Sequence, residues 1–214
     1  MAIVAGTIYG VALNDREQHI SLAAAFESPP YGKPPQRPVL YIKPHNCIAG
    51  DGCKIPLPPD LEQVEIAATL GLLIGRDAGR VAPQAALDYV AGICLALDIA
   101  EPDGSYYRPP VRQRCRDNFL PLGTLADFDP NLLDSDIKTF VNDAAVHVWS
   151  PRRLLRDAAS LIADISAFMT LSAGDLLLLG IPYDAPRARP GDRVMARAEQ
   201  LPDLSVELNA EVAA

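Results

Sequence analysis

Histidine and cysteine are scarce in this sequence, and their scarcity argues against several kinds of site. The 214-residue chain has three histidines, and His19, His45 and His147 match no zinc-binding spacing. We therefore expect no histidine-rich metal site. None of the four cysteines forms a C-x-x-C pair, and we expect them to be reduced thiols, mostly in the core. They are Cys47, Cys53, Cys94 and Cys115.

Long apolar runs are also missing. No run reaches the ~20 residues that a transmembrane helix needs. The N-terminal stretch has no basic residues before its apolar part, so it does not have the pattern of a signal peptide. These features predict a cytoplasmic protein with no membrane partner.

The charge is acidic and the length fits one domain. Lysine and arginine number 19 and aspartate and glutamate 27, which gives a net charge of −8. Such a chain has no overall attraction to phosphate backbones, so we do not expect nucleic acid as a partner. Twenty prolines interrupt the sequence in small clusters without forming a long linker. We expect a single domain over residues 1–214.

The apolar patterning predicts more strand than helix, and therefore an α+β fold. Aliphatic and β-branched runs bounded by turn residues indicate strands. Apolar residues at helical spacing indicate the helices Arg16–Phe26, Ala82–Tyr89 and Arg152–Phe168, the last capped by Ser150. The predicted strands are Ile3–Leu13, Val39–Ile42, Val64–Ile74, Ala91–Ile99, Thr139–Val141, Leu176–Leu179 and Arg193–Ala198.

One short loop holds four arginines, Arg108, Arg112, Arg114 and Arg116, followed by Asp117. Guanidinium groups bind carboxylates through paired hydrogen bonds and stay charged. The loop is therefore either a pocket for a small di- or tricarboxylate or a solvated face with surface ion pairs. The residues alone leave both interpretations open.

Several short pieces occur in an order that resembles the fumarylacetoacetate hydrolase family. Within that family they resemble the N-terminal half of two-part isomerase/decarboxylases that act in 4-hydroxyphenylacetate breakdown. The resemblance implies a strand-rich mixed β-sandwich roll, assembled as dimers or as fused halves. The pieces are Gly6–Asn14, Pro29-Pro30-Tyr31, Ile42-Lys43-Pro44, Tyr107-Arg108-Pro109, Cys115-Arg116-Asp117, Pro121-Leu122-Gly123 and Gly191-Asp192-Arg193-Val194.

The resemblance also implies a Mg²⁺ or Mn²⁺ site, from which this chain departs. Family members bind the metal through an E-x-E pair on one strand and an acidic residue on the next. The matching positions here are Ala67, Thr69 and Asp98, so only Asp98 keeps a carboxylate. Glu65 could replace a ligand only after a two-residue slip of its strand. We expect a degenerate site and no metal bound by this chain alone.

Other positions of the family pattern have changed as well. The lid dyad of histidine and glutamate falls on Gln18 and Ser21, and a lysine near the metal becomes Arg114. The threonine of a Gly-Thr-Pro turn becomes Ile181. Lys43 and Asp117 are retained. The candidate substrate contacts are Lys43, Arg108, Arg114 and Asp117, each of which could equally be structural.

Three functional hypotheses follow from this pattern. In the first, the chain is a subunit of a decarboxylase and isomerase for unsaturated di- and tricarboxylic acids, and a homologous metal-binding subunit or a second copy completes it. In the second, it is a non-catalytic pseudoenzyme with a structural or carboxylate-binding role. In the third, the arginine loop and Lys43 catalyse decarboxylation without a metal, by stabilising an enolate.

Overall fold

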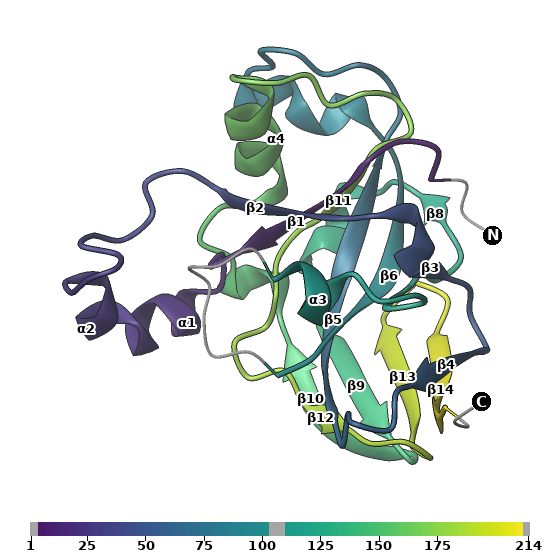
Figure 1. Ribbon diagram of the computed structural model, residues 1–214. Coiled ribbons are helices and arrows are strands. Elements are labelled where there is room, and N and C mark those ends of the chain that lie inside the picture. Colours follow the sequence, from purple (N-terminus) through teal and green to yellow (C-terminus); the bar gives the residue numbers. More distant parts are fainter. Residues whose placement is uncertain (1–3, 103–109, 212–214) are drawn as a thin grey trace.

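A computed structural model describes residues 4–102 and 110–211, which form three β-sheets with a few short helices (Figure 1). The seven-stranded sheet has the order β2-β1-β11-β5-β6-β8, with β12 also paired to β5. Its strands are β1 (Ile8–Ala12), β2 (Val39–Lys43), β5 (Val64–Ile74), β6 (Val90–Ala100), β8 (Ala126–Asp127), β11 (Leu176–Leu178) and β12 (Arg187–Ala188).

The second sheet has five strands in the order β10-β9-β13-β14-β4, and β3 pairs with β7 in a small third sheet. Parallel and antiparallel pairs occur together, since β1 runs parallel to β11 and β14 runs parallel to β4. The strands are β3 (Ile48–Ala49), β4 (Cys53–Leu57), β7 (Leu120–Pro121), β9 (Ile137–Val141), β10 (Ala144–Trp149), β13 (Arg193–Ala198) and β14 (Leu204–Ala210). The predicted strand-rich α+β fold with mixed sheets is confirmed.

The helical segments are short, and no helix in the described residues is long and apolar enough to cross a membrane. They are α1 (Arg16–Ser21), α2 (Ala23–Phe26), α3 (Val111–Arg114), α4 (Ala158–Ser166) and the 3₁₀ helices η1 (His45–Cys47), η2 (Pro83–Tyr89), η3 (Pro130–Asp134) and η4 (Pro151–Arg153).

The main core lies on one face of the long β5–β6 pair. Even-numbered residues of β5, from Val64 to Ile74, point to this face together with odd-numbered residues of β6. They pack against the inner face of the five-stranded sheet and against α4. Because both strands are covered on both faces, β5 reads as a nearly continuous apolar run, which explains why the sequence predicts its bounds correctly.

The opposite face of β5 and β6 is divided into three parts. A small apolar cluster around Ile8, Cys47 and Leu178 covers one end. A second small cluster of Ala12, Ala67 and Ile181 covers the other end. Charged and polar side chains lie on the same face and form the candidate site described below.

The predicted helix Arg152–Phe168 is wrong in its first half. Here the chain forms only the 3₁₀ helix η4, and Ser150 makes no side-chain cap. Helix α4 begins at Ala158 with Asp157 as its N-cap, whose side chain accepts a hydrogen bond from the Ser160 amide at 2.8 Å. Segment 154–156 stays out of the helix because it hydrogen-bonds to a distant segment. Asn14 accepts the Leu155 amide through its carbonyl and the Arg156 amide through its side chain. These tertiary hydrogen bonds override the helical periodicity.

Two other predicted helices take different forms. The predicted helix Ala82–Tyr89 is the 3₁₀ helix η2, with Pro83 in its first turn. The predicted helix Arg16–Phe26 is broken at Leu22 into α1 and α2. The observed strand β1 covers Ile8–Ala12 and is shorter than the predicted strand Ile3–Leu13. The first residue of the predicted strand, Ile3, lies outside the described part of the chain.

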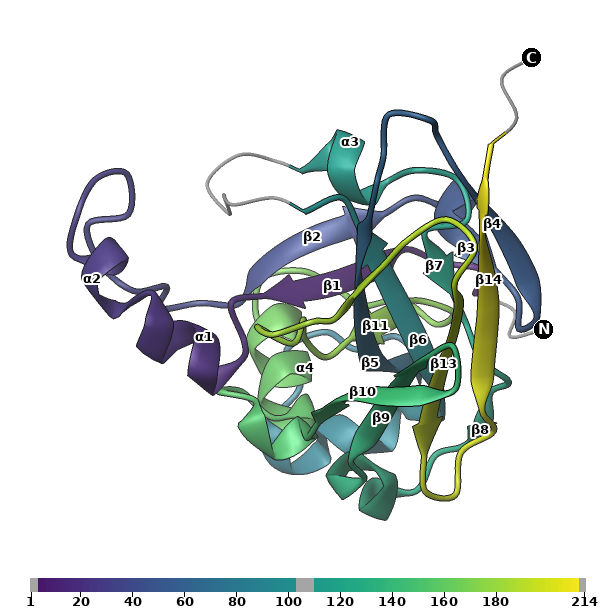
Figure 2. The ribbon, with the colours of Figure 1, turned by 90° about the horizontal axis from the view of Figure 1, so that it is seen from below.

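Helices α1 and α2, with the loop that returns to Pro38, form an arm that stands away from the sheets (Figures 1 and 2). The fully buried Asp15 holds the root of this arm. It caps α1 by accepting the Glu17 amide, and it also accepts the Trp149 indole N–H at 3.1 Å and the Tyr183 amide at 3.3 Å. The Arg153 guanidinium lies 2.9 Å from it and neutralises its charge.

We predict that Asp15→Ala costs about 2–4 kcal/mol of the free energy of unfolding, because it leaves the buried Trp149 indole N–H and the backbone amides of Glu17 and Tyr183 without their acceptor. Urea denaturation followed by the fluorescence of Trp149, the single tryptophan, measures this cost. Asp157→Ala is the matched control, since among the described residues this N-cap side chain accepts only the Ser160 amide and its loss should cost about 1 kcal/mol. Equal costs for the two variants would contradict the buried network.

Candidate functional site

The three positions of the expected metal site lie together on one face of the seven-stranded sheet. Ala67 of β5 is directly opposite Asp98 of β6, and Thr69 is opposite Ala96. Residues two apart on a strand share a face, so Ala67, Thr69 and Asp98 point the same way. Asp98 and Thr69 are fully buried, and the Thr69 hydroxyl has no hydrogen-bond partner among the described residues.

Asp98 is held by two cations and a hydroxyl. The Lys43 ammonium lies 2.6 Å from one carboxylate oxygen, and an Arg114 nitrogen lies 3.3 Å from the other. The Tyr41 hydroxyl donates a short hydrogen bond to that second oxygen. Three separate segments, β2, β6 and α3, are therefore joined at one buried carboxylate.

Lys43 is the central cation of this cluster. It ends β2, is fully buried, and also donates to the Ile99 carbonyl at 2.9 Å and to the Phe119 carbonyl at 2.6 Å. An ammonium group has three N–H donors, and these two carbonyls with Asp98 use all of them. Lys43 therefore acts as a structural counter-ion to Asp98 in this conformation.

The ionisation of Asp98 follows from its neighbours. Burial alone would raise the pKa of Asp98, but the charges of Lys43 and Arg114 and the hydrogen bond from Tyr41 hold this pKa below its usual range. Burial lowers the pKa of Lys43, and the Asp98 charge offsets only part of that effect. The nearby Cys47 thiol is also affected, since burial raises its pKa to about 12.

Tyr41 is a site residue that the sequence did not single out. It lies two residues before Lys43 on β2 and so shares its face, which is the signal that would have found it. Its ring lies across Gly10 of the neighbouring strand, where any Cβ would collide with the ring. Gly10 thus lets Tyr41 reach Asp98 from β2, although β1 and β11 separate β2 from β5 in the sheet.

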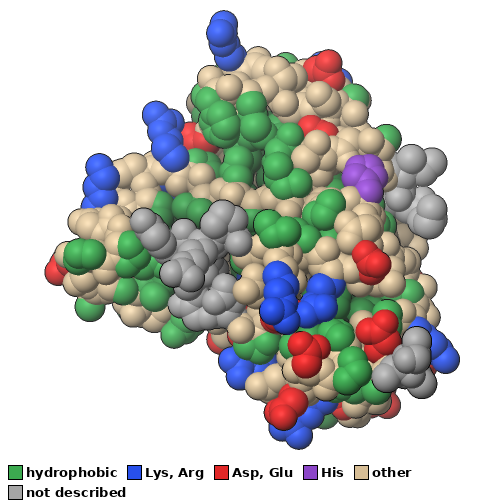
Figure 3. Space-filling model, in the orientation of Figure 1, with side chains coloured by type: hydrophobic (Ala, Val, Ile, Leu, Met, Phe, Trp, Pro, Cys, Tyr) green, Lys and Arg blue, Asp and Glu red, His purple; other side chains and the backbone are tan. Residues whose placement is uncertain are grey.

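The arginine loop does not bring its described guanidinium groups to one point. Arg112 is exposed and pairs with Asp60 at 3.5 Å, whereas Arg116 pairs with Glu101. Only Arg114 turns to the buried site, and its side chain is 10% exposed. Arg108 lies outside the described residues. Figure 3 likewise shows acidic and basic side chains interspersed on this face of the molecule.

The remaining sequence-predicted positions lie apart from Asp98. Asp117 is exposed and accepts a hydrogen bond from Asn46 at 2.6 Å. Glu65 keeps its register opposite Ala100 and pairs with Arg187 at 3.4 Å, so β5 has not slipped. Gln18 and Ser21 belong to the arm, where the Ser21 hydroxyl donates to the Gln18 carbonyl at 2.9 Å.

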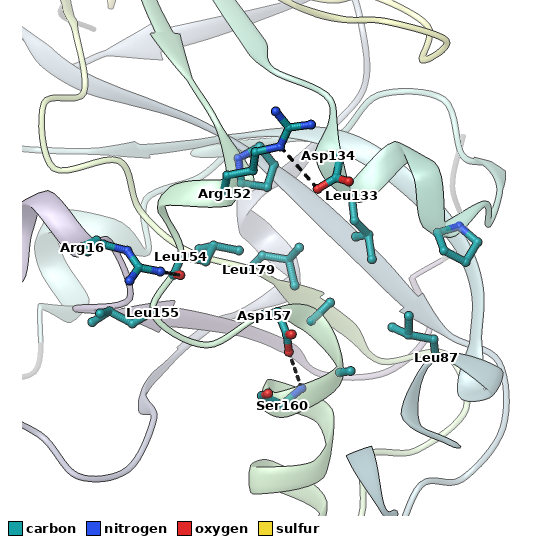
Figure 4. A pocket seen from close by; sticks show the side chains of 14 residues that line it. Arg16, Leu87, Leu133, Asp134, Arg152, Leu154, Leu155, Asp157, Ser160 and Leu179 are labelled. Carbon is teal, nitrogen blue, oxygen red and sulfur yellow. Dashed lines mark hydrogen bonds and ion pairs between the residues drawn. The ribbon is translucent and has the colours of Figure 1, made fainter. Parts of the chain in front are cut away.

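A cavity of about 460 Å³ opens beside the N-terminus of α4 (Figure 4). Its floor is mainly leucine, proline and alanine, and its charged side chains already have partners. Arg16 donates to the Leu154 carbonyl at 3.1 Å, Arg152 lies 3.6 Å from Asp134, and Asp157 caps α4. The residues that line the cavity include no histidine, cysteine or lysine, and Asp98 is not among them.

The family is decided by a match over nearly the whole chain. The family model described as fumarylacetoacetate (FAA) hydrolase C-terminal matches residues 7–209. The chain belongs to the fumarylacetoacetate hydrolase family. This confirms the family that the short sequence pieces indicated.

Within the fumarylacetoacetate hydrolase family, the chain is similar to bifunctional isomerase/decarboxylases. The chain is 40% identical over 206 residues to a 4-hydroxyphenylacetate degradation bifunctional isomerase/decarboxylase of Salmonella dublin, covering 96% of this chain and 48% of that protein. It is 39% identical to a homoprotocatechuate catabolism bifunctional isomerase/decarboxylase of Escherichia coli, covering 93% of this chain and 46% of that protein. The chain therefore spans about half the length of these relatives.

Solved structures of the fumarylacetoacetate hydrolase family share the fold. A 5-carboxymethyl-2-hydroxymuconate delta-isomerase from Mycobacterium smegmatis superposes with a TM-score of 0.81 at 27% identity, covering 99% of this chain and 81% of that one. A fumarylpyruvate hydrolase from Pseudomonas aeruginosa superposes with a TM-score of 0.82 at 20% identity, covering 96% and 90%. That second structure contains Mn²⁺ and pyruvate, so metal binding occurs within the family.

The residues of this chain do not fit such a metal. Mg²⁺ and Mn²⁺ require several hard oxygen ligands. Here both oxygens of Asp98 face cations or a hydroxyl donor, and Ala67 offers no ligand atom. In the described part of the chain, no three histidine, cysteine or acidic side chains are grouped so that they could hold a metal ion. The absence of a bound metal remains a prediction that metal titration would test.

We predict that Asp98→Asn lowers the free energy of unfolding by about 3–5 kcal/mol, because it leaves the buried Lys43 ammonium without its counter-charge. Chemical denaturation measures the loss. Asp117→Asn removes the same charge from an exposed position and should change stability by no more than about 0.5 kcal/mol. A loss of stability no larger than that of the control would show that another group balances the charge of Lys43.

The same ion pair predicts an acid sensitivity. Because the pKa of Asp98 is lowered on folding, its contribution is fully present above the unfolded value of about 4 and is lost as pH falls through the folded value. Stability curves of the wild type and Asp98→Asn should therefore converge as pH falls below about 4. Parallel curves would rule out Asp98 as a source of the acid sensitivity.

Proposed function

We propose that this chain is the metal-free partner in a two-part enzyme of 4-hydroxyphenylacetate catabolism. The enzyme would combine 5-oxopent-3-ene-1,2,5-tricarboxylate decarboxylase and 2-hydroxyhepta-2,4-diene-1,7-dioate isomerase activities. A homologous subunit that keeps the E-x-E carboxylates would supply the metal and the chemistry. This chain would supply the paired half of the assembly.

The observation that carries this proposal is the occupied carboxylate of Asp98. The named relatives at about 40% identity are isomerase/decarboxylases, which supports the reaction class. Asp98, however, is saturated by Lys43, Arg114 and Tyr41, and this supports a binding or structural role for this half rather than catalysis. No step of the reaction is therefore assigned to a metal on this chain.

Arg114 is the residue that we propose for contact with a substrate carboxylate. Its guanidinium group has five donors in a planar fork, which matches a carboxylate. It lies at the boundary between the buried site and the surface, whereas Lys43 is enclosed. Arg114 would thus hold one end of a di- or tricarboxylic acid beside the Asp98 cluster.

We predict that the purified chain does not decarboxylate the tricarboxylate substrate with Mg²⁺ or Mn²⁺, and that adding a homologous chain with intact E-x-E carboxylates from the same organism gives activity above that of the homologue alone. Carbon dioxide release measures both. Robust turnover by this chain alone would overturn the need for a partner. No gain on mixing would favour the pseudoenzyme hypothesis.

Binding is tested separately by calorimetry with the isomerase's dicarboxylate substrate. We predict that Arg114→Ala weakens binding by about 10- to 100-fold, the loss expected for one or two charge-assisted hydrogen bonds. Arg112→Ala, in the same loop but exposed and directed at Asp60, is the matched control and should bind as the wild type does. Equal binding by both variants would remove Arg114 from the site.

A further inference from the structure

Two of the four cysteines lie together, beside the buried cluster of Asp98. Cys47 ends the 3₁₀ helix η1 and is fully buried, whereas Cys115 directly follows α3 and is partly exposed. The two thiols share a hydrogen bond, and Cys115 packs against the small apolar cluster that contains Cys47. All four cysteines of the chain lie in the described residues and are free thiols in this structure.

Hydrogen bonds hold the backbone around Cys115 against the backbone around Cys47. The Asn118 amide donates to the Asn46 carbonyl at 3.0 Å, and the Asn46 side chain donates to the Cys115 carbonyl at 3.1 Å. The Cys47 sulfur lies 3.9 Å from the Arg114 carbonyl, and the strands that follow, β3 and β7, pair with one another. A disulfide requires Cβ atoms about 4 Å apart, so it forms readily between segments that are already held side by side.

The other two cysteines lie on different elements. Cys94 is fully buried in β6, opposite Gly71 of β5. Cys53 begins β4, in the five-stranded sheet. They therefore serve as internal controls for any chemistry of Cys47 and Cys115.

We propose that Cys47 and Cys115 form a reversible disulfide when the folded chain meets hydrogen peroxide. The thiolate of Cys115, the more accessible of the two, attacks one peroxide oxygen, and this gives a sulfenic acid and releases hydroxide. The Cys47 thiolate then attacks the Cys115 sulfur, so that the S–S bond forms and a second hydroxide leaves. The two thiol protons convert both hydroxides to water, so two thiols are oxidised and one peroxide is reduced.

Burial sets the rate of this reaction. It raises the pKa of Cys115 and raises the pKa of Cys47 to about 12, although the charge of Lys43 opposes the effect at both thiols. Because the thiolate is the nucleophile, closure is slow at neutral pH and becomes faster as pH rises. The other charged groups that act on the pair are Asp98, Arg114 and Asp117.

The disulfide would tie the end of α3 to η1, next to Arg114. In the reduced chain the Cys47 thiol makes only a weak contact to the Arg114 carbonyl. The covalent bond would therefore restrict the one described arginine of the loop that turns to Asp98. Its formation does not depend on whether the chain binds dicarboxylates, so its failure would leave the proposed function intact.

Peptide mass spectrometry without reduction tests the proposal. The folded chain is treated with hydrogen peroxide at pH 8, the peroxide is removed with catalase, and the remaining thiols are alkylated in denaturant. A protease that cleaves before aspartate then places the four cysteines in four different peptides. We expect the peptides of Cys47 and Cys115 to be linked and to separate with dithiothreitol, whereas Cys53 and Cys94 are alkylated.

Two variants and the pH dependence complete the test. Cys115→Ser should abolish the linked peptide, and Cys53→Ser is the matched control, which should form it as the wild type does. The rate of linking should rise by up to about tenfold from pH 7 to pH 8. Peroxide treatment that takes Cys115 to sulfinic acid while Cys47 stays reduced overturns the proposal. A link that forms only after Trp149 fluorescence reports unfolding overturns it as well.

Discussion

The buried carboxylate of Asp98 is the constraint on which the site depends. A charge on the inner part of a sheet is tolerated only when it is paired and hydrogen-bonded. Lys43 and Arg114 meet this need from two other segments, and Tyr41 adds a third donor. The positions of β2 and α3 against the β5–β6 pair are thus tied to one ionised group. The small apolar clusters at either end of the same face keep that group away from water.

Much of the fold could be predicted because its main strands have distinctive patterns. β5 and β6 are buried on both faces and appear as long apolar runs, and β13 alternates buried and exposed residues. Strands β4 and β14 were not predicted. β4 contains Pro56, and β14 places Ser205, Glu207 and Asn209 between its apolar residues, so neither strand contains a continuous apolar run. The predicted start of α4 was wrong because Asn14, far away in sequence, accepts hydrogen bonds from the backbone amides of Leu155 and Arg156, which therefore do not join the helix.

The site was predictable in part. The resemblance to the family pointed to positions 67, 69 and 98, and strand periodicity predicts that residues 67 and 69 share a face. The register places Asp98 opposite Ala67. Which carboxylate each arginine pairs with was not predictable. Four arginines in one loop look like a single basic patch, yet the three that are described turn in different directions, and each meets a carboxylate. That choice depends on which acidic groups the fold brings near, and such information is absent from local spacing.

The substitution of fixed cations for metal ligands has a chemical consequence. A divalent ion in an enzyme leaves coordination positions open, so substrate oxygens enter and leave its sphere. The ammonium of Lys43 neutralises Asp98 as a metal would, but its three donors are committed to Asp98 and two carbonyls. It stabilises the fold without offering a coordination position that a substrate oxygen could occupy. A chain built in this way keeps the architecture of the family site but lacks the ligands for a Lewis-acidic metal. Its geometry still supports two functions, recognition of anions at Arg114 and contact with another subunit.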